Sequence, residues 1–182
     1  MAQLTNKKVA FLATNGFEDS ELTVPWEAVR SQGAEAVLIS PESGTITGKN
    51  GHEQKVDLTT AEATPDQYHA LVLPGGVVNG DTLRTDQPAV AFLREIFAQH
   101  KPAGVICHGG WILTDADVLQ GRTLTSYPSL RTDLTNAGAT WVDEEVVVDA
   151  GLVSSRVPDD LPAFCDKLVE EIAEGEHEGQ TA

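Results

Sequence analysis

The sequence is poor in cysteine, and this limits both its redox chemistry and its metal chemistry. Its two cysteines, Cys107 and Cys165, are too few for a disulfide scaffold. Neither has a second cysteine or histidine at zinc-ligand spacing, and the adjacent His108 is poorly placed to share one ion with Cys107. We therefore expect reduced thiols, no metal and no other cofactor.

Basic residues and long apolar runs are also scarce. Lys and Arg total 12 against 28 Asp and Glu, which gives a formal net charge of −16. Nucleic acids and anionic membranes are bound through clustered positive charge, so neither is an expected partner. No apolar run is long enough to cross a membrane, and residues 1–8 lack the features of a signal peptide. We expect a cytoplasmic protein whose acidic end, residues 174–182, is solvated and frayed.

Short apolar runs alternate with amphipathic helical stretches along most of the chain. Apolar runs of this kind are typical of strands covered on both faces, as in a parallel sheet. The spacing predicts helices over residues 20–31 and 88–99, the second with Asp86 as a possible cap. The four expected strands are 9–13, 36–39, 70–73 and 103–106. This pattern predicts one α/β domain over residues 1–182, with a flavodoxin-like, open and mainly parallel sheet and helices on both faces.

Three further segments depart from simple alternation. Residues 43–58 contain three glycines and predict an irregular turn with short strands. Residues 146–149 and 152–155 have strong β-propensity and flank Ala150-Gly151, which predicts a late hairpin. Residues 161–174 predict a closing helix with Pro162 in its first turn.

Ligands of an open α/β sheet bind outside the carboxyl ends of its strands, and three loops at such ends contain unusual residues. The loop after the first strand holds several acids, of which Glu18 is nearest to the strand and is the candidate to point into the crevice. Helix capping is the simpler interpretation of these acids. After the third strand, Gly75-Gly76 is either a plain turn or a loop whose exposed amides form an oxyanion hole.

The loop after the fourth strand contains the strongest candidate, Cys107. In the run Cys107-His108-Gly109-Gly110 the glycines permit the tight backbone of a nucleophile elbow, although Val105 stands where hydrolases have glycine. A helix starting at this point is expected to lower the thiol pKa. The alternative is a buried structural cysteine, which is the interpretation we keep for Cys165.

Eight segments, in order along the chain, resemble one known family. They are residues 16–22, 44–48, 71–76, 106–109, 126–128, 136–138, 145–149 and 153–161. On these segments the sequence resembles the PfpI-type intracellular protease and protein deglycase family, within the class I glutamine amidotransferase-like superfamily. The resemblance covers nearly the whole chain and is much more specific for family than for substrate.

The resemblance implies roles for individual residues. It implies that Cys107 is the nucleophile and that His108 is its neighbouring base or acid. It implies that a protonated Glu18 carboxyl hydrogen-bonds the sulfur. The amides of Gly76 and His108 would line the oxyanion pocket, with Gly75 shaping its wall and Gly109 beside it.

The resemblance also implies a homodimer or hexamer, in which an acid after the glycine pair orients the histidine, in some members across the subunit interface. Asp81 is the nearest such acid, but the intervening stretch is one residue longer than expected. A second departure is Gly110-Trp111, where the family usually has Pro-Gln. Trp111 either reshapes the pocket wall or packs as an ordinary helix residue.

Three functions fit this set of residues. A cysteine enzyme could act on reactive carbonyls, either by removing early glycation adducts of glyoxal and methylglyoxal or by converting these aldehydes directly to hydroxy acids. It could instead hydrolyse peptide bonds. A redox-responsive or chaperone-like stress protein needs only a reactive thiol, and not a paired histidine and acid. We favour carbonyl chemistry, with small carbonyl compounds or glycated proteins and peptides as partners.

Overall fold

The computed structural model describes residues 2–182, and its centre is a seven-stranded sheet. The strand order is β10 (Val147–Asp149), β11 (Leu152–Ser155), β7 (Ala103–Ile106), β6 (Ala70–Leu73), β1 (Lys8–Leu12), β2 (Glu35–Ser40) and β5 (Leu58–Thr59). All neighbouring pairs are parallel except β10 with β11. The predicted open, mainly parallel sheet and its four expected strands are therefore confirmed.

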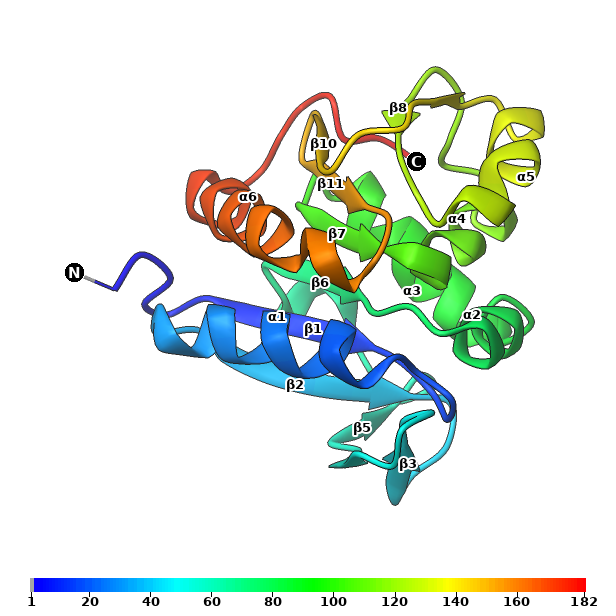
Figure 1. Cartoon of the computed structure of the whole chain (residues 1–182). Coiled ribbons are helices and arrows are strands. Elements are labelled where there is room, and N and C mark those ends of the chain that lie inside the picture. Colours follow the sequence, from blue (N-terminus) through cyan, green and yellow to red (C-terminus); the bar gives the residue numbers. More distant parts are fainter. Residues whose placement is uncertain (1) are drawn as a thin grey trace.

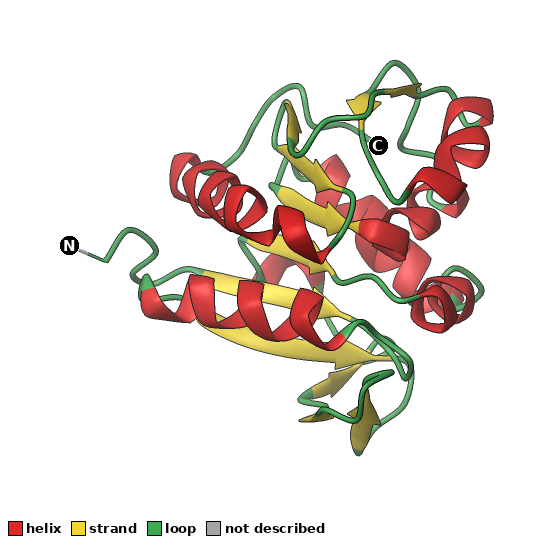
Figure 2. Ribbon diagram, viewed as in Figure 1, coloured by secondary structure: helices red, strands yellow, loops and turns green. Residues whose placement is uncertain are grey.

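Helices cover both faces of the sheet (Figures 1 and 2). One face carries α1 (Asp19–Ser31) and α6 (Leu161–Glu174), and the other carries α3 (Gln87–Ala98), α4 (Ile112–Asp115) and α5 (Arg131–Asn136). Strand β1 shows why two cores form, because Val9 and Phe11 join the α1 side whereas Ala10 and Leu12 join the α3 side. Both faces of the sheet are thus buried.

The helices begin close to where the sequence predicts. Asp86 caps α3, since its carboxylate accepts a hydrogen bond of 3.0 Å from the amide of Ala89. The helix α6 has the predicted bounds. Two helices were not predicted, namely α5 and α2 (Val77–Leu83), which starts directly after Gly76. Among the described residues no helix combines the length and the apolar character needed to span a bilayer.

The two irregular regions form hairpins. Residues 43–58 contain β3 (Thr45–Thr47) and β4 (Glu53–Lys55), which pair antiparallel as a separate hairpin. The predicted late hairpin is β10 and β11, and β11 also pairs in parallel with β7, so this hairpin extends the main sheet. A second small sheet pairs β8 (Thr123–Leu124) with β9 (Thr140–Trp141).

The C-terminal segment differs from the expected frayed end, because it packs against the turn before β7. Gln180 is fully buried and donates a hydrogen bond of 3.1 Å to the carbonyl of Lys101. The backbone oxygen of Gln180 lies 2.6 Å from Nδ1 of His100. These contacts join residues far apart in sequence, so the local acidic composition gave no sign of them.

Candidate active site

Cys107 occupies a sharp turn at the carboxyl end of β7. Its φ of +59° is in the left-handed region, which is rare for a residue with a side chain and is typical of strained functional turns. The chain continues directly into the short 3-10 helix η2 (Cys107–Trp111). Cys107 is only 9% exposed, and its sulfur lies 3.2 Å from Nδ1 of His108. The nucleophile elbow expected of this fold is therefore present.

The expected lowering of the thiol pKa is wrong. Burial raises the pKa of Cys107, and the neighbouring carboxylate of Glu21 raises it further, whereas the backbone N–H groups of His108 and Gly76 act in the opposite direction. The helical segment after the elbow is a 3-10 turn followed by a four-residue helix, so its dipole is small beside the cost of burying a thiolate. Burial thus disfavours the thiolate form of Cys107.

The carboxyl group that faces the sulfur belongs to Glu21, not to Glu18. Glu21 is fully buried in the first turn of α1, and it interacts with the Cys107 thiol. Its Oε2 accepts a hydrogen bond of 2.8 Å from the amide of Gly75. Its Oε1 is also buried and has no hydrogen-bond partner, so this oxygen is free to bond with a group in the site.

Glu18 has a different role, because it is the residue just before α1 and its side chain points toward the β3–β4 hairpin. Its carboxylate pairs with Lys49 at the hairpin tip and accepts a weak hydrogen bond of 3.4 Å from Asn50. The backbone amide of Glu18 donates to the carbonyl of Gly75 at 3.0 Å. Glu18 therefore connects the hairpin to the rim of the site.

The protonation of Glu21 follows from its burial. Desolvation raises the pKa of this carboxyl to about 8, although the Gly75 amide acts to lower it. At neutral pH Glu21 is thus mainly a neutral acid that can donate its proton to sulfur. The neutral form also removes the negative charge that would oppose formation of a thiolate at Cys107.

The glycine pair after β6 brings the backbone close to both side chains. Gly76 has a φ of +101°, and a Cβ at this position would lie 2.3 Å from the carbonyl oxygen of Gly16. A Cβ on Gly75 would lie 2.1 Å from Oε2 of Glu21. Only glycine fits at either position, and the amide of Gly76 is consequently free to point toward the sulfur of Cys107.

Asn79, a residue of α2 that the sequence did not single out, joins two of the strand-end loops. It is fully buried, and its Oδ1 accepts a hydrogen bond of 2.7 Å from the amide of Thr14. Its Nδ2 donates to the carbonyls of Pro74 and Gly75 at 3.0 and 3.1 Å. The side chain thereby fixes the glycine loop relative to β1.

Replacing Asn79 by alanine is expected to reduce the free energy of unfolding by about 2–4 kcal/mol, because buried backbone groups lose their hydrogen-bond partners. Urea denaturation measures the change. Asn15→Ala is the matched control, because Asn15 is exposed and accepts a single hydrogen bond from the amide of Thr47; we expect a loss below about 1 kcal/mol. Equal losses in the two variants would contradict the structural role of Asn79.

His108 is enclosed on three sides. Its Nε2 lies 3.2 Å from Oγ of Ser129, and its ring stacks on Tyr127 with centroids 4.7 Å apart. Trp111 approaches edge-on at 6.3 Å. Burial lowers the pKa of His108, and the positive charge of Lys49 lowers it further. The imidazole is therefore neutral at physiological pH and able to accept the thiol proton.

The other predicted site residues lie as follows. Asp81 is exposed on α2 and makes no hydrogen bond to His108 within the described chain.

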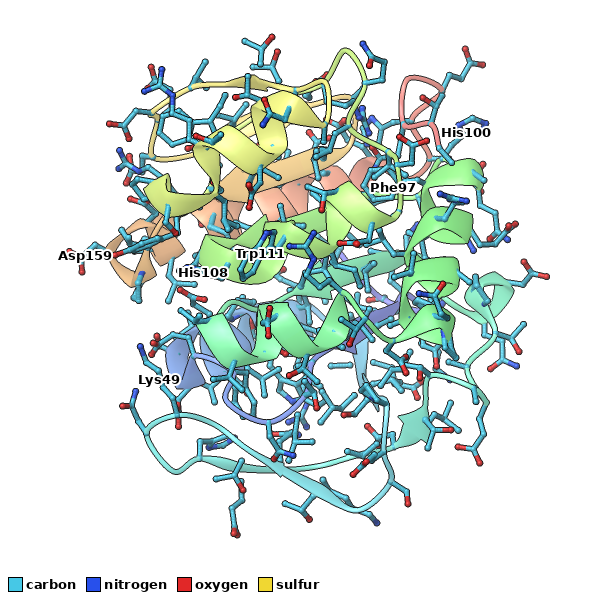
Figure 3. The ribbon with its side chains drawn as sticks, turned by 90° about the vertical axis from the view of Figure 1, so that its right-hand side faces the viewer. Lys49, Phe97, His100, His108, Trp111 and Asp159 are labelled. Atoms are coloured by element: carbon cyan, nitrogen blue, oxygen red, sulfur yellow. The ribbon has the colours of Figure 1, made fainter. Side chains whose placement is uncertain are left out.

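Trp111 donates a hydrogen bond from Nε1 to Asp133 at 2.9 Å, and the Arg84 guanidinium covers its ring, so most of the contacts of Trp111 are packing contacts. Figure 3 shows His108 and Trp111 above α2, with Lys49 near the same edge of the molecule. A Cβ on Gly109 would lie 2.3 Å from the carbonyl of Leu73, so Gly109 fits the elbow against β6.

Sequence reasoning missed four residues that the structure places around the thiol and its loops: Glu21, Asn79, Tyr127 and Ser129. A signal for Glu21 was present, because Glu21, Pro25 and Val29 follow one another at intervals of four and share the buried stripe of α1. Tyr127 and Ser129 lie in a loop whose approach to His108 depends on tertiary packing. Tyr127 stands in one of the segments that resemble the family, residues 126–128, but nothing in the sequence marks it or Ser129 as a neighbour of His108.

Comparison with known proteins identifies relatives over most of the chain. The chain is 49% identical to deglycase PH1704 of Pyrococcus horikoshii over 162 residues, covering 89% of this chain and 97% of that one. It is 46% identical to protein/nucleic acid deglycase 2 of Escherichia coli, covering 87% and 94% of the two chains.

A solved structure shows the same fold. A two-domain protein of Anabaena variabilis with a DJ-1/ThiJ/PfpI-like domain and a ferritin-like domain superposes with a TM-score of 0.89 at 34% identity. The match covers 92% of this chain and 48% of that one, so the chain spans about half of the two-domain protein. The DJ-1/PfpI family itself matches residues 7–171. Because the family model matches most of the chain and relatives of up to 49% identity cover it, the chain belongs to the DJ-1/PfpI family.

Proposed function

We propose that this protein is a cysteine-dependent enzyme that acts on reactive carbonyl compounds, with glycated proteins or their dicarbonyl precursors as substrates. The observation that carries the proposal is the buried Cys107 thiol, which lies between a neutral histidine and a carboxyl group with a raised pKa. Relatives named deglycases, at 46–49% identity, support this class of activity. A structural cysteine would need neither partner.

In the first step, Cys107 attacks the carbonyl carbon while its proton passes to Nδ1 of His108. The 3.2 Å separation of the two atoms allows direct transfer, and the low pKa of His108 keeps the base unprotonated beforehand. The C–S bond forms, and the carbonyl π electrons move to oxygen. Coupling attack to proton transfer avoids a free thiolate, which burial disfavours here.

The amides of Gly76 and His108 and the carboxyl of Glu21 stabilise the negative charge of this step. The backbone N–H groups of both residues point toward the sulfur, where they can stabilise negative charge on the sulfur or on the neighbouring oxyanion. Glu21 donates its proton toward the sulfur without adding charge. The His108 imidazolium then returns its proton to the oxygen, which gives a thiohemiacetal.

When the substrate is a glycated amine, the C–S bond forms as the C–N bond breaks, and the imidazolium protonates the leaving amine, which gives the same thiohemiacetal. A proton then moves from the thiohemiacetal carbon to the adjacent carbonyl carbon, which gives the Cys107 thioester of a 2-hydroxy acid; water adds to this thioester, the C–S bond breaks, and the hydroxy acid leaves as the Cys107 thiol regains its proton.

The enclosure of the site favours small carbonyl groups over an extended peptide. Cys107 and His108 are 9% and 8% exposed, and Tyr127 and Trp111 flank the histidine. A carbonyl at the end of a modified side chain, or a free dicarbonyl, can reach such a thiol. A peptide backbone would need an open groove along the elbow.

The test is to incubate the wild type and Cys107→Ser with methylglyoxal, with a glycated thiol or amine, and with a fluorogenic peptide. We expect turnover of the dicarbonyl or the adduct, and a loss of at least about a thousandfold in the variant. Cleavage of the peptide alone would replace the proposal with a peptidase. Modification of Cys107 by peroxide, with no turnover of any substrate, would instead make the protein a redox sensor.

Asp81 belongs to this proposal only through a second copy of the chain. Its exposure leaves it free to reach His108 of a neighbouring subunit in a dimer or hexamer, where it would orient the ring in place of Ser129. Asp81→Asn should then reduce kcat by about tenfold or more, by analogy with other groups that orient a catalytic histidine. An unchanged rate and an unchanged oligomer size would remove Asp81 from the site.

A further inference from the structure

The C-terminal end of α6 concentrates negative charge where a helix disfavours it. Glu170, Glu171 and Glu174 lie near this end, and the last turn contains no basic residue. The carbonyl end of a helix carries a partial negative charge, so carboxylates here are destabilising unless a cation is near. Lys167 pairs with Glu170, whereas no Lys or Arg of the described chain pairs with Glu171 or Glu174.

The chain then turns back and brings His177 to these two carboxylates. One ligand atom from each of Glu171, Glu174 and His177 lies within 4.8 Å of the other two. Glu171 is more than nine-tenths buried, and its Oε2 lies 3.2 Å from Nε2 of His177. That nitrogen is buried and makes no hydrogen bond, although it lies within ion-pair distance of Glu171. An unpartnered ring nitrogen thus faces two carboxylates.

The position of the His177 ring is fixed by the surrounding backbone. Its amide donates to the carbonyl of His100 at 2.8 Å, and its carbonyl accepts from the amide of Gln180 at 2.8 Å. The ring packs against Gly151, where a Cβ would lie 2.9 Å from the ring carbon Cδ2. These contacts therefore hold the His177 ring in place independently of any bound ion.

We propose that Glu171, Glu174 and His177 bind a divalent cation of the zinc type, with water in the remaining position. Carboxylate oxygen and imidazole nitrogen are zinc ligands at about 2.0–2.2 Å, which places ligand atoms about 3.3 Å apart in a tetrahedral site. Glu174 is exposed, so rotation of its side chain can close the present separation. The proposal departs from the expectation of no metal, which rested on cysteine spacing alone.

The site is separate from the thiol chemistry. The helix α6 runs back along the sheet, and His100 and Gly151 precede β7 and β11, so the cluster lies at the amino edge of the strands, whereas Cys107 lies at the carboxyl edge. Figure 3 shows His100 beside the red C-terminal segment, well away from His108. The bound ion would offset the charge at the helix end and fasten residues 175–182 to α6.

Calorimetric titration with Zn²⁺ tests the proposal, using Cys107→Ser as the parent because the Cys107 thiol can itself bind zinc. We expect one ion per chain, and a Kd at least about tenfold weaker after the further change His177→Gln or Glu174→Gln. Glu170→Gln is the matched control, since Glu170 lies on the same helix outside the cluster, and its Kd should change less than about twofold.

Hydrogen exchange of residues 175–182 gives a second measurement that does not depend on enzyme activity. Zn²⁺ should slow exchange in the parent and leave it unchanged in His177→Gln. Because Glu174 is exposed, Glu174→Gln preserves the fold and keeps the test valid if His177→Gln is unstable. The proposal is wrong if the parent binds no zinc, or if both substitutions leave the affinity unchanged.

Discussion

Replacing Glu21 by leucine is expected to lower kcat/KM by about a hundredfold to a thousandfold, the range typical of losing one group that stabilises charge in a transition state. Leucine keeps the buried volume but cannot donate to the sulfur or accept from the amide of Gly75. Glutamine can do both, because its Oε1 can accept from Gly75 while its Nε2 donates to sulfur. Glu21→Gln should therefore remain within about tenfold of the wild type.

The matched control for this series is Glu18→Gln. Glu18 pairs with Lys49 at the hairpin tip, so its substitution removes an ion pair at the rim and should change kcat/KM less than about threefold. Steady-state kinetics on the substrate found active in the screen provide the measurement. A large loss of kcat/KM in Glu18→Gln, with wild-type rates in Glu21→Leu, would mean that Glu18, as predicted from the sequence, is the residue that hydrogen-bonds the sulfur.

Raising the pH is expected to destabilise the wild type relative to Glu21→Gln. The pKa of Glu21 rises from 4.5 to about 8 on folding because the carboxyl is desolvated. Between these values the folded state holds a proton that the unfolded state has released, so stability is greatest below the unfolded pKa and falls as pH rises through the folded pKa. The slope is about 1.4 kcal/mol per pH unit for one proton.

The difference in unfolding free energy between the two proteins isolates this group. Urea denaturation at several pH values from about 5 to 8 gives both curves, and groups other than Glu21 cancel in the subtraction. We expect the wild type to lose stability relative to Glu21→Gln across this window. A constant difference would mean that Glu21 is ionised in the folded protein, and the proposed proton donation to Cys107 would fail with it.

The fold was largely predictable because its signals are local. Continuous apolar runs identified the four central parallel strands, and the capping residue Asp86 marked the start of α3. The helix α2 was missed because its seven residues include Gly80 and show little amphipathic pattern. The packed C-terminal segment was missed because Gln180 is buried by residues some 80 positions away.

The sequence predicted which thiol and which imidazole the structure brings together, but it did not predict the electrostatics of the candidate site. The run Cys107-His108-Gly109-Gly110 identifies an elbow, since a sharp strand-to-helix turn needs these small residues. Which glutamate faces the sulfur, Glu18 or Glu21, depends on which side of α1 is buried against the sheet. Closeness to the end of the first strand, on which the prediction of Glu18 rested, does not decide this. The thiol pKa depends on burial, which no motif reports, and burial outweighs the short helix after Cys107.

The most direct test of the account is to compare kcat/KM of Cys107→Ser with that of Cys165→Ser. Both thiols are buried, and burial raises the pKa of each, but only Cys107 has the histidine and glutamate beside it. The account predicts a loss of at least about a thousandfold for Cys107→Ser and less than about threefold for Cys165→Ser. Substantial turnover by Cys107→Ser would contradict it.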